Sequence, residues 1–179
     1  MSGQFPLRVS PSGPFEEVGE SSLLASLAQF SKFGPGITEE VAITIPGVEV
    51  AAVTDPIPNI GAPADGQFFE IDATLAMYFE DTAGVTNNRT ITAACNLELD
   101  DGTIQVVALP GPPARGFTVA KFTANQPYDW FARAHATVAA ERTVVRAAII
   151  LSVDSSVTDN PKTVGGNPSP NTIKITRFR

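Results

Sequence analysis

Hydrophobic and polar residues alternate along much of this chain from residue 40 onward. In the clearest stretch, FFEIDATLAMYF at 68–79, every second residue from Phe69 to Phe79 is apolar. Because successive side chains of a β-strand point to opposite faces, this period of two predicts a strand with one buried face. The same period predicts strands at 41–45, 48–53, 90–99, 103–109, 117–122, 143–153 and 172–178.

One segment is ambiguous between helix and strand. The stretch DWFARAHATV at 129–138 is rich in alanine, which suits a helix as well as a strand. We favour a strand, in which one face carries Trp130, Ala132, Ala134, Ala136 and Val138.

The N-terminal region has a different pattern. Residues 1–14 contain three prolines and two glycines, which predicts an extended, irregular arm. A helix is predicted at 21–32, because apolar residues recur there at helical spacing, serines precede them and Gly34 can end the helix. The residues of this pattern are Ser21, Ser22, Leu23, Leu24, Leu27 and Phe30.

These elements predict an all-β fold. The Asp101-Gly102 pair is a strong hairpin signal, so we expect 68–79, 90–99 and 103–109 to form an antiparallel meander. Many short strands with Gly/Pro-rich connections indicate an antiparallel β-sandwich, and eight or nine strands with long loops favour a jelly roll. The predicted division is an arm at 1–14, a sandwich at 15–166 and a C-terminal loop and strand-like tail at 167–179.

Composition narrows the kinds of partner. With 179 residues the chain is most simply one domain. Charged residues make up 17%, below the usual ~25%, so part of the surface is neutral and is either simply bland or buried against partners. The net charge of −7 argues against nucleic-acid binding, which requires phosphate neutralisation. After Asp159 every charged residue is basic: Lys162, Lys174, Arg177 and Arg179.

No targeting or membrane segment is expected. The start, MSGQFPLRVSPSG, lacks the apolar core of a secretory signal, and no stretch approaches the ~20 apolar residues of a membrane span. We therefore expect synthesis in the cytoplasm and no membrane contact. A single cysteine, Cys95, excludes a disulfide within the chain.

Candidate catalytic groups are few. His135 is the only histidine, so one chain cannot supply two histidine ligands, and no nucleophile elbow accompanies it. Cys95 is in phase with apolar neighbours and is expected in the core. Glu70 and Asp72 lie on one strand face at a spacing that would suit a glycosidase pair, although such acids are far more often solvated surface residues. We therefore predict a non-enzyme.

Two binding alternatives remain open. Glu98, Asp100 and Asp101 offer oxygen ligands for Ca²⁺, but the turn explains them better. No glycine-rich phosphate motif is present, and no cofactor is expected. Tyr128, Trp130 and Phe131 are candidates for an aromatic carbohydrate platform.

The two ends of the chain are the predicted assembly elements. Apolar residues on an extended arm are costly in water unless they dock, and the alternating C-terminal strand can join its own sheet or that of a neighbour. The predicted interface residues are Phe5, Leu7, Val9, Phe15, Ile173, Lys174, Ile175, Arg177, Phe178 and Arg179.

The organisation around MSGQFPLRVSPSGPF, the alternating strands and NTIKITRFR resembles the decoration (cement) proteins of tailed-bacteriophage heads. The resemblance implies a β-sandwich on the capsid surface of a virion. It also implies partners that are copies of the chain, as a homotrimer, and a major capsid protein. Deleting 1–14 or 172–179 is then expected to weaken assembly and leave the body folded. The alternatives are a carbohydrate-binding sandwich, perhaps in a receptor-binding appendage, and a hydrolase using Glu70 and Asp72.

Overall fold

The computed structural model describes residues 7–8, 16–17, 28–53, 57, 67–80, 90–111, 125–139, 141–153 and 160–178. All regular secondary structure in these ranges is β-strand, and all strand pairs are antiparallel, which confirms the all-β prediction. The described part of the chain contains no helix long and apolar enough to cross a membrane.

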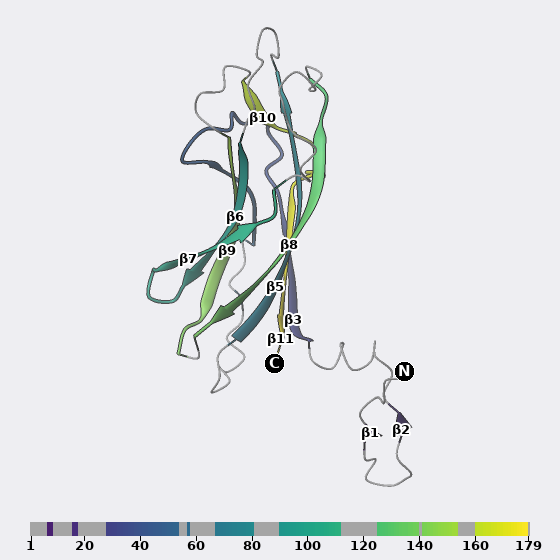
Figure 1. The fold of residues 1–179 in the computed structure, drawn as a ribbon, viewed down its shortest axis with the longest axis vertical. Helices are drawn as coiled ribbons and strands as arrows, with labels where there is room; N and C mark the ends of the chain where they lie inside the picture. Colours follow the sequence, from purple (N-terminus) through teal and green to yellow (C-terminus); the bar gives the residue numbers. More distant parts are fainter. Residues whose placement is uncertain are drawn as a thin grey trace.

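The strands form two layers (Figure 1). One sheet has five strands: β3 (Ala28–Pro35), β5 (Gln67–Phe79), β8 (Tyr128–Val138), β10 (Pro161–Thr163) and β11 (Thr172–Phe178). The other has four, in the order β4 (Val48–Val53), β9 (Val144–Val153), β6 (Ile91–Leu99) and β7 (Ile104–Leu109). A separate pair joins β1 (Leu7–Arg8) to β2 (Glu16–Glu17).

Strand β5 organises the five-stranded sheet. On one edge, residues 67–77 of β5 pair with β8. On the other edge, residues 68–74 pair with β11 and residues 77–79 pair with β10. Strand β3 pairs with the far side of β11. The order across this sheet is therefore β8, β5, β11 and β3, with β10 extending the line of β11.

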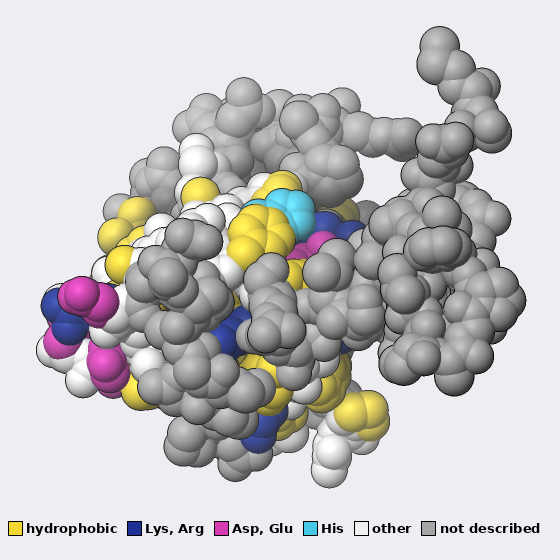
Figure 2. All heavy atoms as spheres, turned by 90° about the horizontal axis from the view of Figure 1, so that it is seen from below, with side chains coloured by type: hydrophobic (Ala, Val, Ile, Leu, Met, Phe, Trp, Pro, Cys, Tyr) yellow, Lys and Arg dark blue, Asp and Glu magenta, His cyan; other side chains and the backbone are white. Residues whose placement is uncertain are grey.

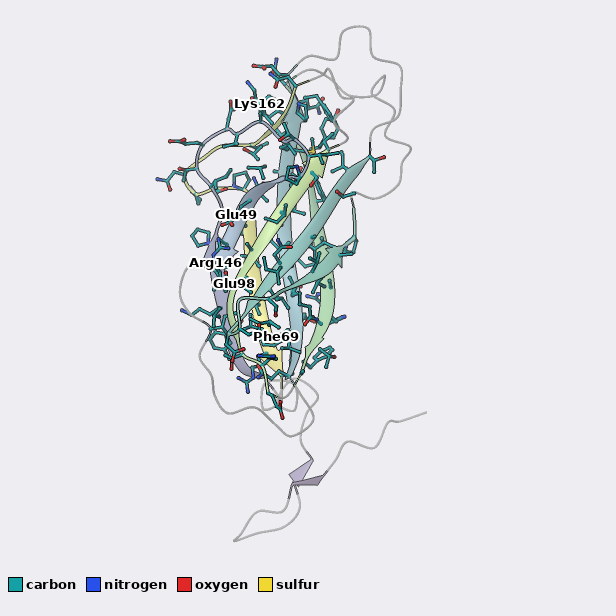
Figure 3. All side chains as sticks on the ribbon, turned by 90° about the vertical axis from the view of Figure 1, so that its left-hand side faces the viewer. Glu49, Phe69, Glu98, Arg146 and Lys162 are labelled. Carbon is teal, nitrogen blue, oxygen red and sulfur yellow. The ribbon has the colours of Figure 1, made fainter. Side chains whose placement is uncertain are left out.

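The core fills the space between the two layers, where Figure 3 places Phe69. The alternating residues of β5 that were predicted to share one face are all buried, as are the inward residues of β6 and β9. This burial of period-two side chains from both sheets is what stabilises a sandwich. From β5 the core residues are Phe69, Ile71, Ala73, Leu75, Met77 and Phe79.

The two sheets approach each other closely where β3 leads into β4. Gly36 forms a bridge with Ala51, and the Ile37 amide donates to the Val50 carbonyl at 3.0 Å. A Cβ on Gly34 would lie 2.0 Å from the Ala52 carbonyl oxygen. Only glycine therefore permits the two backbones to come this close.

The predicted helix at 21–32 is wrong over the residues that the structure describes. Residues 28–32 belong to β3, which pairs with β11 from Pro35 to Ala28. Here tertiary pairing overrides a local helical pattern, and Gly34 lies inside the strand instead of ending a helix. Residues 21–27 lie outside the described residues.

Two further expectations need correction. The predicted meander is only half right, because β6 and β7 form the hairpin but β5 belongs to the other sheet. The segment 41–45 is not a regular strand; it contacts β10 through a bridge from Ala42 to Lys162. The predicted strand at 117–122 lies outside the described residues, whereas 128–138 is a strand as favoured.

The C-terminal segment is not a tail. Strand β11 lies between β5 and β3, with Ile173 and Ile175 fully buried. Its cationic character is divided between two faces: Lys174 is exposed opposite Asp72 in register, whereas Arg177 is buried, and burial lowers its pKa. The predicted boundary at 167 therefore cuts through the sandwich.

Candidate interaction surface

The outer face of the five-stranded sheet carries one phenylalanine from each of its four long strands. Phe33, Phe68 and Phe131 are 64%, 42% and 58% exposed, and Phe178 is half-buried. We call these four residues the aromatic face. A phenylalanine on the outer face of each of the four long strands is unusual for a surface that contacts only water.

Strand register explains why these side chains point outward. Phe68 precedes Phe69, which is fully buried, so the alternation of β5 turns Phe68 to the opposite side. Phe178 lies opposite Phe68, and Phe131 lies opposite Thr74 on the same face. Phe33 lies opposite Lys174, which is exposed on the outer face, so Phe33 lies on that face too.

Aromatic contacts join three strands at one end of this face. The rings of Phe68 and His135 stack with centroids 5.4 Å apart and an interplanar angle of 19°. Phe178 contacts Phe68 at 6.0 Å in a tilted arrangement. Figure 2 shows the histidine beside exposed hydrophobic side chains, with charged groups next to them. The cluster is thus a continuous aromatic surface across β11, β5 and β8.

A row of charged side chains adjoins the cluster. Arg133 donates from Nε to Asp72 at 2.7 Å and lies 3.7 Å from Glu70. His135 lies 3.5 Å from the same glutamate. The hydrogen bond to Asp72 and the nearby negative charges raise the pKa of Arg133. Its guanidinium also lies 5.6 Å from the Phe131 ring centroid, which links the charged row to the aromatic face.

The two acidic residues that were candidates for a glycosidase pair both form ion pairs with one arginine. The side chains of Glu70 and Asp72 both approach Arg133 from across the strand pair. One arginine therefore forms ion pairs with both carboxylates on this exposed surface. Aromatic and arginine side chains on one surface are typical of protein interfaces.

The predicted interface residues separate into four groups. Ile173, Ile175 and Arg177 are buried inside the sandwich. Lys174 and Phe178 are on the outer face with the aromatic face. Leu7 belongs to β1, and the remaining four lie outside the described residues: Phe5, Val9, Phe15 and Arg179.

The predicted carbohydrate platform does not form as a single surface. Trp130 is buried at 6% exposure on the inner face of β8, while its neighbour Phe131 points outward. Within the described part of the chain, the indole Nε1 of Trp130 has no hydrogen-bond partner. Of these three aromatic residues, Phe131 is exposed to a ligand, Tyr128 is half-buried and Trp130 is not accessible.

Two further candidates from the sequence, Cys95 and Asp101, have well-defined surroundings in the structure. Cys95 is buried, and burial raises the pKa of its thiol to about 12. Asp101 accepts hydrogen bonds from the backbone and hydroxyl of Thr103 and pairs with Arg142 at 2.9 Å. These hydrogen bonds lower the pKa of Asp101. Among the described residues no group of three or more His, Cys, Asp or Glu side chains is placed to hold a metal ion.

Sequence reasoning missed Phe33 and Phe68 as surface residues. A pair of consecutive phenylalanines in a strand must place one ring on each face, so the FF pair at 68–69 contained the signal for Phe68. Phe33 was missed because it follows the helix wrongly predicted at 21–32, so no strand and no sheet face were assigned to it.

Comparison with known proteins gives distant matches only. No family model matches the sequence, and no curated protein matches it. Among solved structures, the chain is similar to the VP2 subviral particle of infectious bursal disease virus, at 9% identity and a TM-score of 0.40, covering 85% of this chain and 38% of that one. A structure of the Gt strain of that virus gives 9% identity and a TM-score of 0.40, covering 97% and 42%.

A further similar structure is the enzymatically active domain of a bacteriophage CBA120 tailspike protein, at 12% identity and a TM-score of 0.31, covering 83% of this chain and 17% of that one. The chain spans about two fifths of the length of the viral proteins. At these identities and TM-scores, the similarities indicate neither a shared family nor a shared function.

Proposed function

We propose that this chain is a structural, non-enzymatic protein that stabilises a viral capsid or a similar assembly. The observation that carries the proposal is the aromatic face, with its four phenylalanines on four neighbouring strands. Covering the exposed part of each ring would contribute roughly 1–2 kcal/mol to binding, from the area removed from water. The adjoining charged row would fix the orientation of the partner.

Strand pairing supports a jelly roll as the fold of this assembly protein. The eight long strands pair as β3·β11, β4·β9, β5·β8 and β6·β7, so the first pairs with the last, the second with the next to last, and so on inward. A long antiparallel ribbon wound into two sheets gives this order. Double-sheet jelly rolls occur in viral capsid and lectin domains, among others.

The specific role that we propose is that of a decoration protein on the surface of a phage head. It would bind a major capsid protein and copies of itself, as the resemblance in sequence organisation implies. An acidic chain with one buried cysteine and an exposed aromatic face suits a protein that works through surface contacts. Homotrimer formation on the capsid, in contact with the major capsid protein, belongs to this proposal.

The experiment compares binding of variants to virus particles purified from the source by density gradient. The double variant Phe33→Ser and Phe131→Ser should cosediment with the particles at least tenfold more weakly, since two rings then lose their contacts. Val41→Ser is the matched control, because Val41 is also exposed but lies outside the aromatic face. Equal binding of the double variant and the wild-type chain would contradict the proposal.

A carbohydrate ligand is the second candidate, and one observation favours it. Phe131 is exposed beside Arg133 and the two carboxylates, which together offer a stacking ring and hydrogen-bonding groups. Phe131→Ser, rather than a change at the buried Trp130, is the informative variant. Binding on a broad glycan array that Phe131→Ser abolishes would support this alternative, and no binding by the wild-type chain would exclude the glycans tested.

A further inference from the structure

Strand β7 forms an edge of the four-stranded sheet and has few features that would prevent another strand from pairing with it. In the described sheets it pairs only with β6, and the register of that pairing has no bulge. Its sequence, IQVVAL, contains no proline and no ionisable residue. Natural edge strands normally carry a charge, a proline or a bulge that prevents another strand from adding to them. Strand β7 therefore lacks these devices.

The phase of the β6–β7 hydrogen bonds shows which backbone groups face outward. The Leu99 amide donates to the Thr103 carbonyl at 2.8 Å, so these two residues form a hydrogen-bonded pair at the start of the hairpin. In an antiparallel ladder such pairs recur every second residue. The N–H and C=O groups of Ile104, Val106 and Ala108 are consequently directed away from β6.

The same three residues expose apolar side chains. Ile104 and Val106 are 56% and 65% exposed, and Ala108 is also exposed. The neighbouring Gln105 points inward and donates from Nε2 to the Thr137 carbonyl at 3.2 Å, which holds β7 against β8. Within the described sheets, the backbone groups of β7 that have no strand partner and its exposed apolar side chains thus belong to the same residues.

We infer that β7 pairs with β7 of a second copy of this chain, antiparallel and about a two-fold axis at Val106. In this register Val106 meets its counterpart and Ile104 meets Ala108. All three residues with outward backbone groups then pair with one another, and the large side chain of Ile104 lies opposite the small one of Ala108. The two four-stranded sheets would join into one continuous sheet of eight strands, an isologous contact.

Charge does not oppose a second copy as the occupant, because the contact would be made by an uncharged strand. Each chain carries a net charge of −7, so two copies repel unless they meet at an uncharged surface. The charged groups on the outer face of this sheet, Glu49, Arg146 and Glu98, are on β4, β9 and β6 and not on β7 (Figure 3). In the proposed register the acidic turn at Asp101 lies opposite Gly111, which places the two turns at opposite ends of the joined strands.

The test measures self-association of the full chain by light scattering over a wide concentration series. Wild type should form a dimer, and Val106→Lys should weaken it by at least about tenfold, because a lysine on an edge strand opposes strand addition. Val41→Lys is the matched control, and its dimer should be unchanged. Val106→Pro removes an outward N–H but no ladder bond to β6, so it should prevent dimerisation and leave the fold intact.

Hydrogen exchange identifies the contact independently. The amides of Ile104, Val106 and Ala108 should exchange more slowly as concentration rises. A chain that stays monomeric, a dimer unaffected by Val106→Lys, or a dimer in which these three amides remain unprotected would overturn the inference. The double variant of Phe33 and Phe131 should dimerise normally, so this inference and the proposed capsid role can fail separately.

Discussion

The side chain of Asn171 forms a hydrogen bond with the backbone of Ala76, at the point on the edge of β5 that lies between β10 and β11. Its Oδ1 accepts a hydrogen bond from the Ala76 amide at 2.8 Å, and the Ala76 carbonyl accepts one from the Val164 amide at 3.2 Å. Between these two contacts the chain leaves the edge of β5, since β10 ends at Thr163 and β11 begins at Thr172. Asn171 is fully buried and thus closes the gap in the ladder.

Replacing Asn171 by alanine should therefore lower the free energy of unfolding by about 1–3 kcal/mol, because a buried amide loses its acceptor. In a chain of this size that corresponds to a fall in Tm of roughly 3–10 °C, measurable by calorimetry. Asn96→Ala, at a half-buried position on β6, should lower it by less than about 1 kcal/mol. Equal Tm values for the two variants would argue against the role assigned to Asn171.

Removing residues 172–179 should abolish folding instead of merely weakening assembly. The deletion takes away the strand between β5 and β3 together with Ile173 and Ile175, two fully buried side chains. Circular dichroism and the dispersion of amide proton signals would report the loss. Deletion of residues 1–14 is the comparison, because among the described strands β1 pairs only with β2, and it should leave the sandwich folded. A folded chain without β11 would contradict the topology.

Gly34→Ala tests the close approach of the two sheets. The added Cβ would lie 2.0 Å from the Ala52 carbonyl oxygen, a contact that forces backbone movement. We expect a loss of at least about 2 kcal/mol in the free energy of unfolding by denaturant titration. Gly111→Ala is the control, since its nearest atom would be 3.4 Å away, and it should change stability little. Similar stability of both variants would mean that β3 and β4 separate easily here.

Cys95 should be unreactive in the folded protein. Burial raises the pKa of its thiol from 9.0 to about 12, so at pH 8 almost no thiolate is present, and the sulfur is inaccessible. A thiol reagent should label it only after unfolding in denaturant. The thiol of the unfolded chain ionises at a lower pH than the thiol of the folded chain. The free energy of unfolding should therefore fall as pH rises from 9 toward about 12, by at most about 1.4 kcal/mol per pH unit, and this group should have no such effect below pH 9. Rapid labelling of the native chain would refute the buried position.

Strands with a regular period of two were predictable from the sequence. From β5 the alternation predicted both the strand and its buried face, and Asp101-Gly102 predicted the β6–β7 hairpin. These signals are local, because each depends only on residues a few positions apart. Cys95 was placed in the core for the same reason.

The pairing of distant strands was not predictable, because it depends on contacts that leave no local pattern. Nothing near Phe30 indicates that residues 28–35 pair with 172–178, and the helical spacing of leucines there was misleading. The aromatic face was missed for a related reason. Four phenylalanines that are scattered from 33 to 178 become neighbours only when four strands align.

The most direct test of the proposed capsid role is to look for the chain in virus particles from its source. Particles are banded in a density gradient, and peptides of this chain are quantified by mass spectrometry across the fractions. A capsid component should follow the main shell protein at a constant ratio across the gradient. Recovery of the chain only in the particle-free fractions would contradict the proposed capsid role.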